Sequence, residues 1–202
     1  MRVSPRCPAG GLVSVALMLA IAPPASAHWF ATGLGPIYDG ISHVLLTPEC
    51  MVPVIGLALL AGLRGPEHGR WALFIVTGAC LLGAELVSTP PAPGVVALQT
   101  AALCLVLGGL VAADLHIPLG VTATLAAIVG VVGGASNAAA HQVGAGEAAV
   151  VGVCVTVFVL TALTASVIVP LRIPWLRVTA RVLGSWLAAL GLLLAGWSLR
   201  VK

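Results

Sequence analysis

Six long apolar runs with almost no charge divide the chain, and this pattern restricts the folds that are open to it. The runs cover residues 41–63, 71–88, 95–113, 117–140, 148–169 and 178–199. Each is close to the ~20 residues that a helix needs to cross a hydrocarbon core of ~30 Å. The runs are continuously apolar and do not alternate, so membrane helices are predicted rather than barrel strands.

The composition supports a protein whose surroundings are the lipid bilayer. Apolar residues make up 60% of the 202 residues and charged residues only 7%, whereas a soluble globular chain carries about a quarter charged residues. The net charge of +3 comes from scattered Arg and Lys, with no basic stripe of the kind that binds nucleic acid. The predicted fold is an all-α polytopic bundle of six transmembrane helices, with loops too short for a soluble domain.

The N-terminal residues 1–27 have the pattern of a signal peptide. A positively charged start and a short apolar run precede Ala25-Ser26-Ala27, the small-x-small form that signal peptidase accepts; the alternative is a retained first helix. Cleavage would leave residues 28–202 as the six-helix domain with His28 at its N-terminus. A free α-amine beside an imidazole chelates divalent transition ions, although His28 can equally be only the point where the signal ends.

Basic residues are unevenly shared between the two sides of the predicted bundle. With His28 outside, the inner loops and helix ends contain Arg64, Arg70, Arg172, Arg177 and Arg181. The outer loops contain no Arg or Lys, and only the C-terminal tail departs from the pattern. This bias predicts an inner-membrane protein with its mature N-terminus outside.

The start of the first span carries an unusual density of polar side chains. Helical spacing places four of them on one face, namely Asp39, His43, Thr47 and Cys50. A carboxylate one turn before a histidine can fix the imidazole tautomer or bind an ion beside it. The alternative is that Asp39 caps the helix and His43 bonds a neighbouring helix. We expect Pro48 and Pro53 to bend this span.

Further polar groups fall on the outer half of the bundle. They are Glu85 near the end of the second span, and Asn137 and His141 one turn apart near the end of the fourth. Glu85 either extends to the interface or supplies a carboxylate to the His43 region. Asn137 either bridges helices or joins the site. His141 either joins the site or is a loop or interface residue. Asp114, His116 and Glu147 are interpreted as solvated loop residues.

Cysteines and glycines in the spans are interpreted as packing residues. Cys50, Cys80, Cys104 and Cys154 show no paired spacing, so they are expected to be small apolar fillers without disulfides. Small-xxx-small spacing recurs in residues 78–83 and 130–134, which favours close helix packing in lipid. No catalytic or phosphate-binding motif is present, so neither an enzyme nor a resident cofactor is predicted. An intramembrane enzyme would need a nucleophile and a base brought together in space.

The stretch Pro36–Leu45 resembles the first-helix motif of the HupE/UreJ family, approximately His-Pro-Leu-x-Gly-x-Asp-His. It matches at Gly40 and His43, and the signal before His28 and the six spans also resemble that family. Pro36 and Ser42 stand where the family has His and Asp. The family's fourth-helix motif, Phe-His-Gly-x-Ala-His-Gly, falls on residues 132–138, which contain no His. The resemblance implies a role in nickel or cobalt supply.

These observations together predict a secondary permease for a divalent transition-metal cation of the nickel or cobalt class. His43 is the central metal ligand in this hypothesis, Asp39 orients it or ligates, and His28 captures the ion outside. Possible additional polar ligands are Cys50, Glu85, Asn137 and His141. The alternative is a membrane scaffold or assembly partner that has lost the family's metal site, and the sequence does not identify its protein partner.

Overall fold

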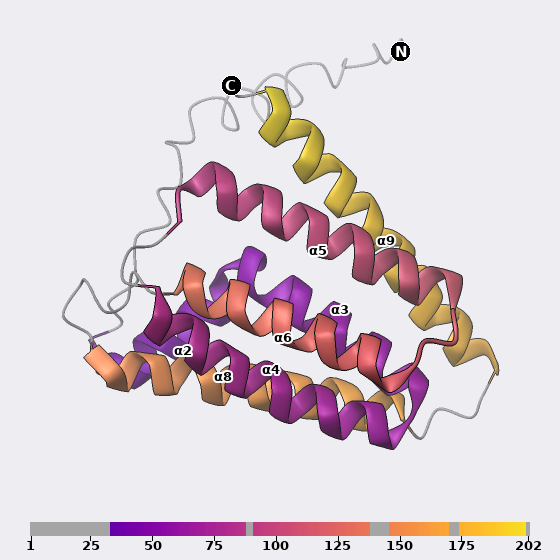
Figure 1. Cartoon of the computed structure of the whole chain (residues 1–202), viewed down its shortest axis with the longest axis horizontal. Coiled ribbons are helices and arrows are strands. Elements are labelled where there is room, and N and C mark those ends of the chain that lie inside the picture. Colours follow the sequence, from indigo (N-terminus) through magenta and orange to yellow (C-terminus); the bar gives the residue numbers. More distant parts are fainter. Residues whose placement is uncertain (1–32, 88–90, 138–145, 170–173, 201–202) are drawn as a thin grey trace, which may run out of the picture.

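The computed structural model describes residues 33–87, 91–137, 146–169 and 174–200. In these ranges 90% of the residues are helical and there is no strand, which confirms the all-α prediction (Figure 1). The helices are α2 (Pro36–Leu46), α3 (Pro48–Arg64), α4 (Pro66–Leu86), α5 (Pro93–Ala113), α6 (Leu119–Ser136), α8 (Gly146–Ile168) and α9 (Pro174–Arg200). The predicted signal peptide, His28 and His141 lie outside the described residues.

Five helices are long and apolar enough to cross a membrane, and six spans result if the bent pair α2–α3 counts as one. The predicted run 41–63 is therefore not a single straight helix. Its two parts are bent by 73° at a break centred on Thr47. Pro48 begins α3, because proline has no N–H to lose and its fixed φ suits a first helical turn. Pro53 lies inside α3 without ending it.

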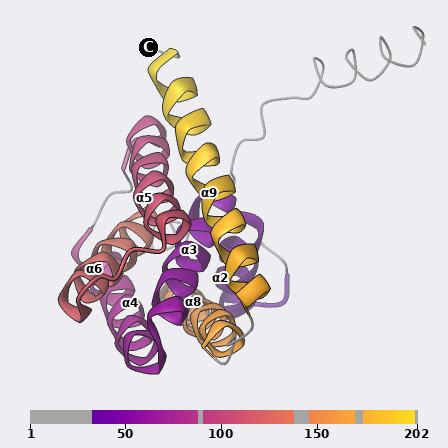
Figure 2. The same ribbon diagram turned by 90° about the vertical axis from the view of Figure 1, so that its right-hand side faces the viewer.

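Helix α3 is the central element of the bundle. It contacts α2, α4, α5, α6, α8 and α9, and the end-on view shows it between the pair α5–α9 and the group α4, α6 and α8 (Figure 2). Leu57 and Leu60 of α3 and Leu107 of α5 are fully buried where these helices meet. The large apolar side chains on the outer faces of the helices are exposed, as lipid contact requires.

Close packing between helices depends on glycines at the contact lines. In lipid, apolar burial does not drive helix association, so backbones must approach closely enough for van der Waals contact. A Cβ at Gly130 or Gly134 of α6 would overlap the α4 backbone, and one at Gly108 of α5 would overlap α9. The predicted packing role of residues 130–134 is confirmed; in residues 78–83, Gly83 packs against Val131 while Gly78 faces open space.

The bundle has two polar ends. At one end α3 and α5 finish and α9 begins, and Arg64, Asp114 and Arg177 meet there; we name it the Asp114 end. At the other end α6 finishes beside the start of α3, and Asn137 lies near Cys50; we name it the Asn137 end. The Asp114 end lies at the right in Figure 1 and the Asn137 end at the left.

Candidate functional site

The Asn137 end contains a small cavity beside the break between α2 and α3. Residues of α2, α3, α4, α6 and α8 line it. Its polar lining comes from Cys50, Cys80 and Asn137, and the rest is Val and Gly. The space is sufficient for about one water molecule. A second small cavity borders Cys50 as well, and Glu49, Thr100 and Ser136 contribute to its lining.

Asn137 is the most deeply buried amide of this region, with only 2% of its surface exposed. Its Nδ2 donates a hydrogen bond to the Gly133 carbonyl at 2.6 Å and lies 3.9 Å from Cys50 Sγ. Its Oδ1 is buried and has no hydrogen-bond partner among the described residues. Leaving a buried acceptor unpaired costs about 1–3 kcal/mol, so a water molecule that donates a hydrogen bond to Oδ1, or a cation coordinated by it, would be stabilised here.

Two of the four described cysteines, Cys50 and Cys80, line this cavity. Cys154 of α8 lies near enough to Cys80 of α4 to interact with it. Cys50 of α3 lies near enough to interact electrostatically with Cys80. All described cysteines are free. Cys104 of α5, by contrast, is buried in the apolar core.

The interpretation of Cys80 and Cys154 as apolar fillers does not predict that the two residues lie near each other. They are far apart along the chain and come from helices that are not consecutive. The only available signal was that a thiol falls near the middle of several spans. Which thiols meet depends on the order in which the helices pack.

Helix α2 carries the two principal metal ligands of the sequence hypothesis. Asp39 is buried, and His43 is half-buried one helical turn further on. The Ser42 hydroxyl donates to the Asp39 carbonyl oxygen at 3.0 Å. Helix α2 is held against α8 where Gly40 and Gly152 let the two backbones approach. The pair is therefore fixed to the bundle by backbone contact.

The predicted single face of four polar residues is wrong in one respect. Helix α2 ends at Leu46, and Thr47 is the extended residue between the helices. Cys50 therefore belongs to α3, whose axis is turned away from α2, and it does not continue the Asp39–His43 face. The prolines responsible were recognised in the sequence, but the size of the bend was not.

The candidate ligands do not converge into one metal centre within the described part of the chain. No group of three or more His, Cys, Asp or Glu residues there is placed to hold a metal ion. Glu85 is exposed in the last turn of α4, and Asn137 faces the cysteine cavity. His28 and His141 fall outside the described ranges. Asp39 and His43 thus form a two-residue arrangement on α2.

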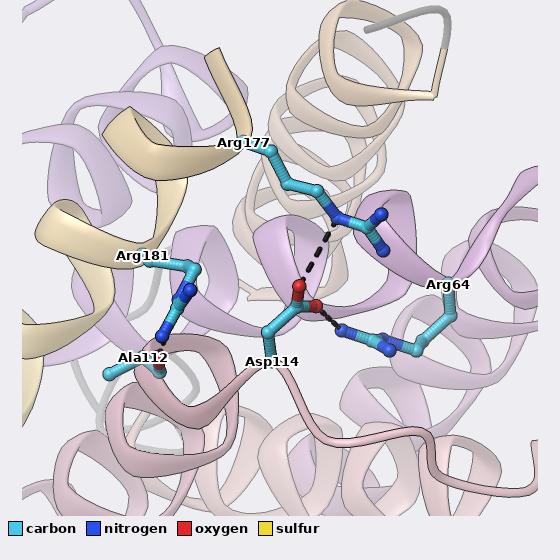
Figure 3. A network of polar contacts seen from close by, with 5 residues as sticks. All are labelled: Arg64, Ala112, Asp114, Arg177 and Arg181. Carbon is cyan, nitrogen blue, oxygen red and sulfur yellow. Dashed lines mark hydrogen bonds and ion pairs between the residues drawn. The ribbon is translucent and has the colours of Figure 1, made fainter. Parts of the chain in front are cut away.

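The Asp114 end carries an ion-paired cluster instead (Figure 3). The Asp114 carboxylate pairs with Arg64, whose side chain is 3% exposed, and with Arg177 Nε at 3.2 Å. Arg181 Nε donates to the Ala112 carbonyl at 2.9 Å. Arg64 Nε has no partner among the described residues. The interpretation of Asp114 as a solvated loop residue is therefore wrong, because it joins α3, α5 and α9.

A second polar link lies in the neighbouring helices. His68 Nδ1 of α4 and Thr122 Oγ1 of α6 are 2.9 Å apart, and Thr122 is fully buried. This contact joins two helices that also pack closely through glycines. It has the geometry of a structural hydrogen bond between spans.

Comparison of the chain with models of protein families, with curated proteins and with solved structures found no match.

Proposed function

We propose that the protein is a HupE/UreJ-like membrane permease for a divalent transition-metal cation of the nickel or cobalt class. The observation that carries this proposal is the position of Asp39 and His43, one turn apart on a short helix that breaks from the rest of its span. Broken spans are a recurrent way for transporters to place ion ligands inside the membrane. The Asp39 carboxylate and the His43 imidazole are suitable ligands for a cation of this class.

The distribution of charge supports an orientation for this permease. Arg64, Arg177 and Arg181 lie together at the Asp114 end, and positively charged ends of inner-membrane proteins stay in the cytoplasm. In the proposal the Asn137 end therefore faces outward. His28, which comes before α2 in the chain, would then be on the side from which the ion enters.

Uptake of radiolabelled nickel and cobalt tests the proposal. Cells expressing the wild type are expected to accumulate label above an empty vector, and His43→Ala is expected to lower accumulation to the vector level because the central ligand is lost. His116→Ala is the matched control, since His116 is an exposed histidine between α5 and α6. Equal loss in both variants, or wild-type uptake no greater than the vector with the protein in the membrane, would contradict the proposal.

A scaffold or assembly role is the second candidate, and one observation favours it. Within the described ranges the candidate ligands form no three-residue metal group. A scaffold needs the packed bundle but no ion path. The scaffold role predicts that His43→Ala and Asp39→Asn leave the phenotype of the producing cells unchanged. Variants that disrupt helix packing are expected to change that phenotype. This pattern is opposite to the one expected of the permease.

A further inference from the structure

We propose that Glu49, Thr100 and Ser136 bind one sodium ion in a crevice between α3, α5 and α6 at the Asn137 end. The three residues come from three different helices and line the same small cavity. The site shares no residue with the pair Asp39 and His43, so sodium binding does not depend on the permease proposal. Only the use of sodium as the ion that drives uptake rests on that proposed function.

The crevice exists because α5 and α6 pack little against each other. Helix α5 packs mainly against α9 and α3, and α6 packs mainly against α4. A space therefore remains between the first turns of α3, the first half of α5 and the last turns of α6. Gly133 lines this space without a side chain, and a Cβ at that position would meet nothing within 4 Å. The cavity has room for about one water molecule or one dehydrated ion.

Thr100 is the buried polar residue of this crevice. It is 3% exposed, and its hydroxyl takes part in none of the hydrogen bonds found among the described residues. The other buried threonines of the described ranges are bonded, Thr122 to α4 and Thr156 and Thr161 to carbonyls of α8 itself. A buried hydroxyl oxygen without a partner is costly. Coordination of a cation in the cavity would offset that cost.

The other two ligands supply one negative charge and a second hydroxyl. Glu49 is an exposed residue of the first turn of α3, so an ion can reach its carboxylate from outside the bundle. Ser136 Oγ donates its proton to the Val132 carbonyl at 2.8 Å, which leaves the oxygen lone pairs available to a cation. Ser136 is also the last residue of α6, and the C-terminal end of a helix attracts positive charge.

The donors select a hard monovalent cation. All three are oxygen ligands, which hard cations prefer, whereas nickel and cobalt favour imidazole, and the described lining contains no histidine. One sodium ion beside one carboxylate leaves no net charge, and net charge is costly in apolar surroundings. A divalent ion would leave one positive charge, and calcium takes about six to eight oxygen ligands. Sodium is also an ion that secondary transporters bind inside the membrane.

Binding of radiolabelled sodium to the purified full chain in micelles tests the site. The wild type is expected to bind one ion per chain, saturably, against a choline background. Glu49→Gln is expected to weaken binding by more than about 10-fold, because the attraction between unit charges outside bulk water exceeds that factor. Glu67→Gln is the matched control, since a proline and then an exposed glutamate begin both α3 and α4.

Two further variants separate binding from folding. Thr100→Val preserves shape and is expected to weaken binding by about 10-fold, the usual order for a neutral group bonded to a charged one. Thr156→Val should leave binding unchanged, because that hydroxyl is bonded within α8. Gly133→Ala adds a methyl group that clashes with nothing, so the chain should fold while the smaller space lowers sodium affinity. Gly120→Ala is its control on the same helix, because a Cβ there also meets nothing within 4 Å.

Either of two results would overturn the site. One is the absence of saturable sodium binding in the folded wild type, and the other is equal sodium affinity of the three variants and their controls. Failure of the permease proposal is distinguishable from both. Sodium binding that depends on Glu49, in a protein that takes up no nickel, supports the site and contradicts the permease. Nickel uptake that is equally fast in sodium-free choline buffer overturns the driving role of sodium.

Discussion

The two ends of the bundle use polar side chains in opposite ways. At the Asp114 end one carboxylate receives two guanidinium groups, and a third arginine bonds the end of α5. At the Asn137 end the buried amide oxygen of Asn137 lacks a partner among the described residues, and a cavity lies beside it. The first arrangement joins three helices, whereas the second leaves a buried polar atom unpaired in a residue that lines a small cavity.

This difference separates a structural end from a candidate binding end. Buried charges that are paired with one another hold helices in position, and removing one partner is strongly destabilising. Buried polar groups with incomplete hydrogen bonding lower stability and are retained where they bind something. The bend of 73° between α2 and α3 also lies toward the Asn137 end. Variants at the two ends should therefore differ in whether they change stability or binding.

The largest expected effect is that of Asp114→Asn. The substitution removes the charge that compensates Arg64, whose side chain is 3% exposed, so the free energy of unfolding should fall by about 3 kcal/mol. Reversible unfolding in mixed micelles, followed by far-ultraviolet circular dichroism, measures the change. Glu67→Gln is the control, because Glu67 is an exposed carboxylate in the first turn of α4. An equal effect at Glu67 would mean that the net charge of this end, and not the ion pairs of the cluster, stabilises it.

The sequence was sufficient to predict the helices but not their contacts. Continuous apolar runs predicted the spans, but not the break inside the first one. The largest differences in where a span begins are at α2, which starts at Pro36 rather than at residue 41, and at α4, which starts at Pro66 rather than at residue 71. Asp114 was misassigned because it follows the last turn of α5 and therefore resembles a loop residue. Its partners come from α3 and α9, which are far from it in the chain.

The candidate site shows the same limit. Asp39 and His43 were recognised because their spacing of four is local and survives in α2. The prediction that Cys50 shares a face with Asp39 and His43 assumes that one helix continues through Thr47. The helix breaks there instead, because the backbone geometry at a proline is not fixed by residue type alone. The proximity of Cys80 and Cys154 depends on how α4 and α8 pack, which no periodicity within either helix encodes.

A smaller loss of stability is expected from Gly40→Ala, which tests whether the Asn137 end also needs close packing. A Cβ at this position would overlap the Ala149 carbonyl of α8, so α2 must shift, at a cost of about 2 kcal/mol in unfolding free energy. Gly109→Ala is the matched control, because a Cβ there meets nothing within 4 Å. The control should be neutral or stabilising by up to about 1 kcal/mol. Equal behaviour of the two variants would show that α2 is not held by this contact.

The smallest expected effect concerns a single hydrogen bond between helices near the Asp114 end. Thr122 and Thr161 are both fully buried, but Thr122 Oγ1 contacts His68 of α4, whereas Thr161 Oγ1 donates to the Val157 carbonyl of its own helix. Thr122→Val should therefore lower the unfolding free energy by about 0.6 kcal/mol more than Thr161→Val, the usual contribution of a hydrogen bond between membrane helices. The same micelle unfolding experiment resolves the pair, since both substitutions preserve shape. If Thr161→Val proves the more costly, polar groups at this end stabilise helices individually, and only the charged cluster around Asp114 joins them.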